Sequence, residues 1–254
     1  LGHLEAWDGD APLGLGPHKQ HRLILDAGRV VAVDRLVDDL WGTAVPDSAV
    51  KMVQIYVSQL RKVLPPGTLV TRRPGYAADL SGHTLDLDRF GDLRRRGAEA
   101  LARGDAREAS DRLHAALSLW RGEPLAEFEE PFALLERAAL EATRLACVED
   151  RVEADLALGR HAEIAGELEA LVARHPGRER LCSLAMLALY RCGRQGDALA
   201  TYDAFRRSLD EELGIAPSAE LRELQVRILR QDPALDQAAV AEPEPAPAPA
   251  GTGP

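Results

Sequence analysis

The stretch that decides the fold is Ser48–Leu64, SAVKMVQIYVSQLRKVL. Its apolar residues recur at steps of three and four, which at about 100° per residue places them on one side of an amphipathic helix. The predicted buried stripe consists of Val50, Val53, Val57, Leu60 and Leu64. The opposite side carries Lys51, Ile55, Ser58 and Lys62, flanked by Gln54, Gln59 and Arg61. We therefore predict a helix with one face in a core and one polar face in solvent.

The same stretch opens a window that contains no acidic residue. Between Ser48 and Ala78 there is no Asp or Glu, although the chain of 254 residues contains 41 of them. The basic residues of this window are Lys51, Arg61, Lys62, Arg72 and Arg73. A basic helix face is often only a solvated surface, but a short helix before it and a basic hairpin after it favour contact with a polyanion. The window therefore predicts a surface that binds double-stranded DNA.

Charge divides the chain into two parts. Residues 1–80 hold nine basic and nine acidic residues, and the remainder holds 22 basic and 32 acidic ones. The second part therefore carries the whole net charge of −10. This asymmetry fits one module that faces DNA, joined to an acidic module that meets proteins.

Composition and motifs exclude several classes of protein. No run of about eighteen apolar residues could span a membrane, and no charged segment followed by an apolar run opens the chain. We therefore expect a cytoplasmic, nucleoid-associated protein with no membrane partner. The three cysteines have no metal or redox spacing and are expected to be reduced thiols. Single histidines, and the absence of phosphate-loop, dinucleotide and nucleophile motifs, predict no metal, no cofactor and no enzyme activity.

Shorter segments on both sides of the long helix complete a winged helix-turn-helix. Before it we predict short strands in Leu1–Leu15, a first helix in Pro17–Leu25, a β-branched run in Arg29–Val33 and a two-turn helix in Asp34–Trp41. Gly42 is the expected C-terminal cap of that helix, and Ser48 the expected N-cap of the next. After it, Thr68–Leu80 is predicted to be a hairpin. In this geometry the long helix enters the major groove and the hairpin lies on the backbone or in the adjacent minor groove.

The second part of the chain has the pattern of a helical repeat. Leu85–Leu229 is nearly continuous helix-compatible sequence, with predicted breaks at Gly104, 121–124, Gly159, 176–177, Gly193 and 214–217. The triplets Leu158-Gly159-Arg160 and Cys192-Gly193-Arg194 are 34 residues apart, the period of a tetratricopeptide repeat. Two such units cannot bury a core alone, so neighbouring helices are expected to stack on them. Residues 233–254, rich in Ala and Pro, are predicted to be a disordered tail.

Several segments resemble one known family. DRLVDDLWG from Asp34, QIYVSQLRKVL from Gln54 and LVTRRPGY from Leu69 resemble the response-regulator-type winged helix of the streptomycete antibiotic regulatory proteins. LDLDRF from Leu85, ALSLWRGEPLAEF from Ala116 and the stretch 193–229 resemble the bacterial transcriptional activation domain that follows it in that family. The resemblance implies a mainly α protein: a winged helix-turn-helix (α+β) in residues 1–82, followed by an all-α, tetratricopeptide-like domain in residues 83–232.

The resemblance also implies a function. Members of that family are transcription activators of actinobacterial secondary metabolism. They bind short direct repeats near a promoter as two protomers in tandem, a homodimer on DNA, and their protein partner is the RNA polymerase holoenzyme. The same likeness adds Lys19, at a family-like position near the DNA backbone, to the candidate residues.

The pattern and the resemblance together name ten residues for DNA contact. Basic side chains would hold phosphates or reach guanine edges, and the two amides and the serine would bond to bases or to the backbone. Ile55 is either a tolerated exposed residue or a contact for a thymine methyl group. The full set is Lys19, Lys51, Gln54, Ile55, Ser58, Gln59, Arg61, Lys62, Arg72 and Arg73. Aromatic residues such as Trp41, Tyr56 and Tyr76 are predicted to pack in the core.

Three departures from the family leave alternatives open. Strand residues that normally precede Leu1–Leu4 are absent, the first helix is about one turn shorter, and Lys51-Met52 stand where relatives often have small polar residues. A second hypothesis is therefore a helical-repeat scaffold whose degenerate winged helix docks a protein. A third is that the chain is a fragment of a larger regulator with a further ATPase domain.

Overall fold

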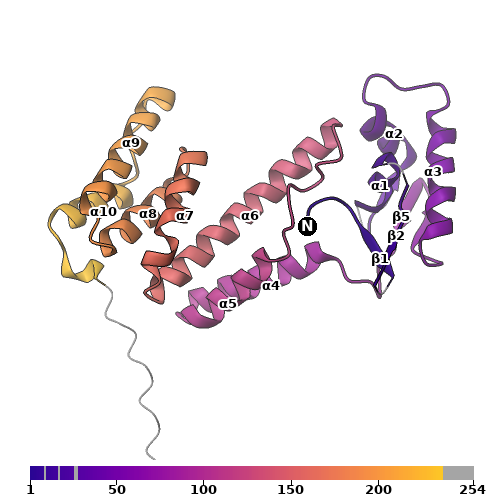
Figure 1. The fold of residues 1–254 in the computed structure, drawn as a ribbon. Coiled ribbons are helices and arrows are strands. Elements are labelled where there is room, and N and C mark those ends of the chain that lie inside the picture. Colours follow the sequence, from indigo (N-terminus) through magenta and orange to yellow (C-terminus); the bar gives the residue numbers. More distant parts are fainter. Residues whose placement is uncertain (9, 17, 26–27, 237–254) are drawn as a thin grey trace, which may run out of the picture. The chain divides into compact units, whose positions relative to one another are not determined.

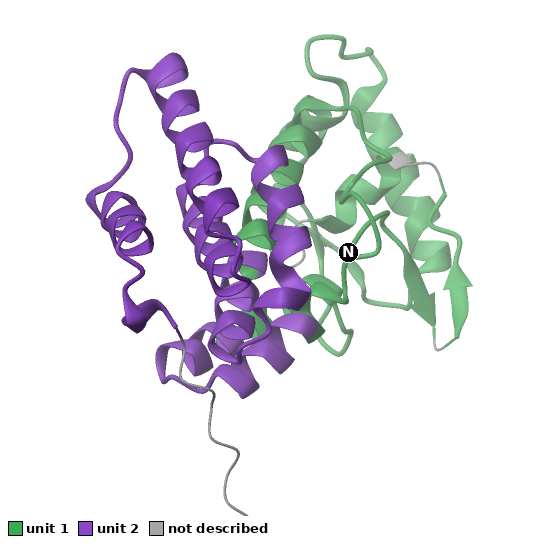
Figure 2. Ribbon diagram, turned by 60° about the vertical axis from the view of Figure 1, so that its left-hand side comes forward, with its two compact units in different colours: residues 1–95, 115–147 green, residues 96–114, 148–254 purple. Residues whose placement is uncertain are grey.

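The computed structural model describes residues 1–8, 10–16, 18–25 and 28–236. They form two compact units, one of residues 1–95 with 115–147 and one of residues 96–114 with 148 onward (Figure 2). The first unit begins with β1 (Ala6–Asp8), β2 (Ala11–Leu13), α1 (His18–Leu25), β3 (Val30–Ala32), α2 (Val33–Trp41), α3 (Ala49–Val63), β4 (Leu69–Arg72) and β5 (Gly75–Ala78) (Figure 1). The remaining elements are α4 (Asp86–Ala102), α5 (Ala106–Leu117), α6 (Pro131–Ala157), α7 (His161–Arg174), α8 (Glu179–Arg191), α9 (Gln195–Leu213), α10 (Ala219–Leu229) and a 3₁₀ turn (Pro233–Leu235).

The first unit contains a winged helix. Strands β4 and β5 form the hairpin, with Leu69 opposite Ala78, and β3 pairs antiparallel with the other edge of β5. Gly75 is required in this sheet, because a Cβ atom there would lie 1.8 Å from the carbonyl oxygen of Val31. Strands β1 and β2 form a separate two-stranded antiparallel sheet.

Helix α3 lies against the core of the winged helix much as its periodicity predicts. Val53, Val57, Leu60 and Leu64 are buried among α1, α2 and the sheet. The prediction for Val50 is wrong, because its side chain is 49% exposed and Ala49, at 3%, is buried in its place. At about 100° per residue, Val50 lies about 80° around the helix from Leu60, whereas Ala49 lies only about 20° away.

The two predicted helix caps have different outcomes. Gly42 ends α2 with φ 54°, and its N–H donates to the carbonyl of Asp38 at 2.8 Å, so the glycine cap is confirmed. Ser48 precedes α3 as predicted, but its side chain makes no capping hydrogen bond, so the predicted side-chain cap is wrong. The backbone dihedral angles of Ser48, φ −93° and ψ 9°, lie outside the extended region that an N-cap residue usually adopts.

A segment far along the chain completes the first unit. Phe128, Phe132, Leu125 and Ala133 form a buried cluster against which Leu25 of α1 packs. The Phe128 ring meets His21 edge-on, with centroids 6.1 Å apart. The compact unit that holds the winged helix therefore extends beyond residues 1–82 and includes the start of α6 and the loop before it.

The second unit repeats pairs of packed helices that are joined by short glycine turns. Helix α7 packs on α8, and α8 on α9. Gly104, Gly159 and Gly193 each take a φ between 75° and 78°, and the residue after each glycine donates its N–H five residues back, to Ala100, Asp155 and Leu189. This 6→1 bond in a left-handed glycine turn is a Schellman motif. All predicted breaks fall between observed helices, and the tetratricopeptide-like arrangement is confirmed.

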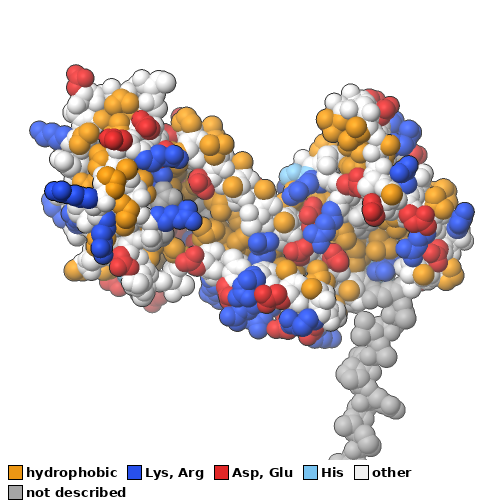
Figure 3. Space-filling view, turned by 180° about the vertical axis from the view of Figure 1, so that it is seen from behind, with side chains coloured by type: hydrophobic (Ala, Val, Ile, Leu, Met, Phe, Trp, Pro, Cys, Tyr) orange, Lys and Arg blue, Asp and Glu red, His pale blue; other side chains and the backbone are white. Residues whose placement is uncertain are grey.

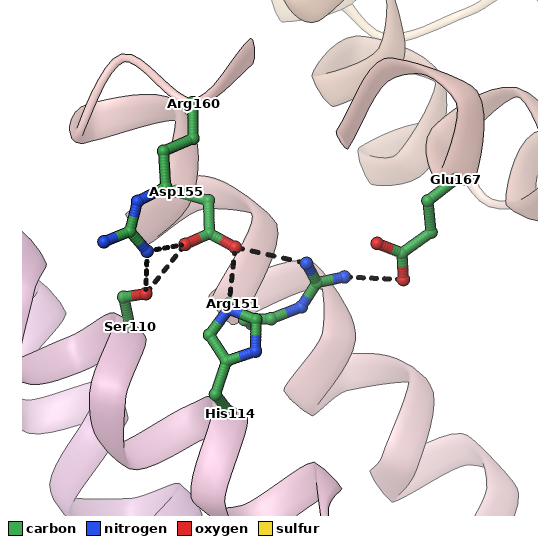
Figure 4. Close-up of polar contacts among 6 residues, drawn as sticks. All are labelled: Ser110, His114, Arg151, Asp155, Arg160 and Glu167. Carbon is green, nitrogen blue, oxygen red and sulfur yellow. Dashed lines mark hydrogen bonds and ion pairs between the residues drawn. The ribbon is translucent and has the colours of Figure 1, made fainter. Parts of the chain in front are cut away.

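Asp155 of α6 is the centre of a buried polar network in this unit (Figure 4). Its carboxylate accepts hydrogen bonds from Ser110 at 2.7 Å, Arg160 at 3.0 Å and Arg151 at 3.1 Å, and lies 3.2 Å from His114. Burial alone would raise the pKa of Asp155, but the Ser110 hydrogen bond and the nearby positive charges outweigh burial and lower the pKa below its ordinary value.

The second unit extends past α10. Leu235, in the short 3₁₀ turn, is 3% exposed and joins the cluster of α8, α9 and α10, while its carbonyl accepts a hydrogen bond from Arg191 at 2.9 Å. The predicted start of the tail at residue 233 is therefore wrong for residues 233–236. The rest of the predicted tail, 237–254, lies outside the described residues.

In the described part of the chain, no helix is long and apolar enough to cross a membrane. The same part contains no group of three or more potential metal-ligating side chains. The three cysteines are free thiols, and burial raises the pKa of Cys182 to about 12.

Candidate nucleic-acid interface

The outward face of α3 and the β4–β5 hairpin form the candidate interface. Lys51, Ile55, Ser58 and Lys62 follow one another at helical spacing and are all exposed. We call these four residues the reading face. Ile55 is 45% exposed, as single apolar side chains on a protein surface often are, so its exposure alone does not mark a contact site. Gln54, also exposed, lies beside this face.

The hairpin adds two arginines. Arg72 ends β4 and Arg73 begins the turn, and both side chains are exposed. Among the described residues, neither arginine forms a hydrogen bond or an ion pair, and the same holds for Lys51 and Lys62. Figure 3, seen from behind Figure 1, shows blue side chains projecting at the left, in the part of the first unit where α3 lies. Hydrogen bonds from Ser81 and, more weakly, the charge of Arg72 lower the pKa of Asp79, so Arg72 has an acidic neighbour. Lys51, Lys62 and Arg73 are the cations free to meet phosphates.

Three of the ten candidate residues have partners inside the first unit. Lys19 donates to the carbonyl of Leu40 at 3.2 Å and lies 5.5 Å from the centre of the Trp41 ring. Its ammonium is also 3.9 Å from Glu130. The structure therefore brings Lys19 into contacts that hold α1, α2 and the loop before α6 together.

Gln59 and Arg61 lie on the two flanks of α3. Gln59 accepts a hydrogen bond from Gln20, whose side chain is buried in α1. Arg61 lies on the opposite flank and donates from Nε to the carbonyl of Leu69 at 2.8 Å and from a terminal nitrogen to the hydroxyl of Thr71 at 2.9 Å. Both flanks of α3 are thus tied to neighbouring elements by side-chain hydrogen bonds.

Sequence reasoning missed the polar groups that support the interface from behind. Arg22 and Asp39, both buried, form an ion pair at 2.6 Å between α1 and α2, and the Arg22 guanidinium lies 5.0 Å from the centre of the Phe132 ring. Only the appearance of charged residues among the apolar positions of two short helices could have indicated this pair. The predicted packing of Trp41 and Tyr56 is confirmed, since their rings stack with centroids 6.4 Å apart.

Comparisons with known proteins agree with this architecture. The family model described as the bacterial transcriptional activator domain matches residues 85–229. The chain is 46% identical over 246 residues to regulatory protein AfsR of Streptomyces coelicolor, covering 95% of this chain and 25% of AfsR. It is 40% identical over 239 residues to regulatory protein DnrI of Streptomyces peucetius, covering 89% of this chain and 88% of DnrI. The chain thus spans about a quarter of the first relative and most of the second.

A solved structure shares the fold. It is that of EmbR from Mycobacterium tuberculosis in complex with a low-affinity phosphopeptide, with a TM-score of 0.85 and 36% identity, covering 91% of this chain and 64% of EmbR. A winged helix followed by a tetratricopeptide-like helical region defines a class of bacterial transcriptional regulators. The chain belongs to the streptomycete antibiotic regulatory protein family of transcriptional activators, whose members are regulators and not enzymes.

Proposed function

We propose that the chain is a sequence-specific DNA-binding transcriptional activator of a secondary-metabolite gene cluster. The observation that carries this proposal is the acid-free segment Ser48–Ala78, in which Lys51, Lys62 and Arg73 are exposed and form no ion pair within the described residues. These three cations can meet a polyanion without first breaking an intramolecular ion pair.

Helix α3 is the element proposed to enter the major groove. Ser58 and Gln54 supply hydrogen-bonding groups beside the groove floor, and Ile55 supplies an apolar contact for a thymine methyl group. The β4–β5 hairpin then lies along the flanking phosphates with Arg72 and Arg73. On this view, two protomers bind direct repeats in tandem, and the acidic helical unit contacts the RNA polymerase holoenzyme.

The scaffold hypothesis has less support. A degenerate winged helix would be expected to lose its core, whereas Leu36, Val53 and Leu60 are each 0% exposed. The first helix, although only eight residues long, packs against both α2 and α3. A folded winged helix with free cations on its outer face favours the DNA-binding hypothesis.

The test is an electrophoretic mobility shift with the full chain on promoter fragments of its own gene cluster, against a scrambled fragment, over a range of salt concentrations. We expect a specific shift that weakens with salt. Lys62→Ala should reduce the slope of log affinity against log salt by about 0.9, the effect of losing one phosphate contact. The matched control is Arg107→Ala, which removes the same charge from an exposed site on α5.

The control should leave binding unchanged. Absence of any specific shift from the folded protein would refute the proposal, and the helical unit would then be the place to search for a protein partner. Footprinting of a shifted fragment would show whether the protected bases form direct repeats.

A further inference from the structure

Arg61 is basic, exposed and part of the candidate interface, yet its hydrogen bonds are made to the β4–β5 hairpin, which is the wing of the winged helix. Its Nε donates to the carbonyl of Leu69 at 2.8 Å and its terminal nitrogen to the hydroxyl of Thr71 at 2.9 Å. Both acceptors belong to β4. The planar guanidinium therefore connects the last turn of α3 to the strand that leads into Arg72 and Arg73.

Strand β4 needs such a partner. It is one of the two edge strands of the sheet, since the strand order is β3-β5-β4. The carbonyl of Thr68 faces β5 and accepts from Asp79 at 2.7 Å, so the next carbonyl along the chain, that of Leu69, faces away from the ladder. Arg61 supplies the donor that the sheet cannot.

We infer that Arg61 is a positioning residue that fixes the angle between α3, which carries the reading face, and the wing, and is not itself a phosphate contact. The inference rests on the proposed DNA-binding function. Its physical basis is pre-organisation: helix and wing engage one duplex together only if their mutual geometry already matches it. A guanidinium with two donors at fixed angles holds that geometry in a way that a single ammonium cannot.

Four variants distinguish a positioning role of Arg61 from the effect of its positive charge. Thr71→Val removes one acceptor and leaves every charge in place. Arg61→Lys keeps the charge and loses the two-point geometry, and Arg61→Ala loses both. Lys62→Ala is the matched control, because Lys62 is the next residue, is exposed and has no hydrogen bond or ion pair among the described residues.

The first measurement needs no DNA. Hydrogen–deuterium exchange of the full chain should show faster exchange across residues 68–79 in all three variants at Arg61 and Thr71, and no change in Lys62→Ala. If neither Arg61→Ala nor Thr71→Val changes this exchange, the turn at residues 65–67 holds the wing without Arg61, and the inference is overturned.

The second measurement uses the promoter fragment. Arg61→Ala should weaken specific binding by roughly 3- to 10-fold, the effect of losing about one ordinary net hydrogen bond. In a background that already carries Arg72→Ala and Arg73→Ala, the same change should have less than about a twofold effect, because the wing no longer contributes. A further fall of about 0.9 in the salt slope in that background would show a direct phosphate contact and overturn the inference. If the wild-type chain binds no fragment, the proposed function fails, while the exchange result still decides the role of Arg61 in the wing.

Discussion

Replacing Phe128 by Ala should destabilise the winged helix, although Phe128 lies far from it in the sequence. Its side chain is 1% exposed and packs edge-on against His21 of α1 and against Phe132, with ring centroids 6.1 and 5.5 Å apart. Truncating a fully buried Phe costs about 3–5 kcal/mol, of which roughly 0.5–1.5 kcal/mol reflects each aromatic pair. This is a large part of a typical stability of about 5–15 kcal/mol.

The assay is hydrogen–deuterium exchange of α1 and α3 peptides in the full chain, together with urea unfolding. We expect faster exchange in both helices and a loss of about 3 kcal/mol or more. The matched control is Leu135→Ala, four residues into α6 and 76% exposed, which should change stability by less than about 0.5 kcal/mol. If Phe128→Ala accelerates exchange in α6 alone and leaves α1 and α3 at the wild-type rate, the reasoning is refuted.

Three further predictions concern the sheet, the polar network and a thiol. Gly75→Ala would place a Cβ atom 1.8 Å from the Val31 carbonyl, so thermal unfolding should show a loss of at least about 3 kcal/mol and promoter binding should fall with it. Asp155 has a lowered pKa in the folded state, so its contribution to stability is full above its unfolded pKa of about 3.9 and is lost as pH falls through the folded value. Urea unfolding between pH 2 and pH 7 should therefore show a steeper acid loss in the wild type than in Asp155→Asn, which does not titrate. With the pKa of Cys182 raised to about 12, a thiol reagent at pH 8 should modify the half-buried Cys192 and leave Cys182 unmodified until the unit unfolds.

For each of these three predictions, a specific result would contradict the reasoning. For the sheet, Gly91→Ala is the control, since a Cβ atom there meets nothing within 4 Å and should stabilise α4 slightly. Equal stability of the two alanine variants would contradict the steric argument. Parallel acid-unfolding curves for the wild type and Asp155→Asn would show that titration of the Asp155 carboxylate does not cause the loss of stability at low pH. Modification of Cys182 at the same rate as Cys192 would show that the α8–α9 core opens readily.

The elements of this fold were predictable because their signals are local. The period of α3 and the glycine after α2 can be recognised from neighbouring residues, and Gly104, Gly159, Gly193 and Gly214 of the helical unit mark turns in which the glycine has a positive φ. The difference between Val50 and Ala49 was not predictable from apolar character. It depends on where the core lies around the helix, and alanine is buried as readily as valine when it faces that centre.

The candidate site was predictable only as a set of exposed cations. Lys51, Lys62 and Arg73 could be selected from the sequence because the window holds no Asp or Glu, and in the described residues they form no ion pair, whereas Arg72 acts on Asp79 just outside the window. Arg61 has the same chemistry and the same window, yet it binds Leu69 and Thr71. Whether such an arginine forms hydrogen bonds within the chain depends on an acceptor that the local sequence does not reveal. For Arg61 this acceptor is the carbonyl of Leu69, eight residues away, whose direction follows from the register of β4 on β5.

The contacts of α1 link the reading helix to the region matched by the activator-domain model. On one side Gln20 holds Gln59 of α3, and on the other Lys19 faces Glu130 and His21 meets Phe128. A helix of eight residues held on both sides cannot shift against one neighbour without disturbing the other. If a partner moves the segment around Phe128, it must therefore change the free energy of the candidate nucleic-acid interface. If the proposed function holds, linkage requires that DNA change the affinity for that partner by the same factor.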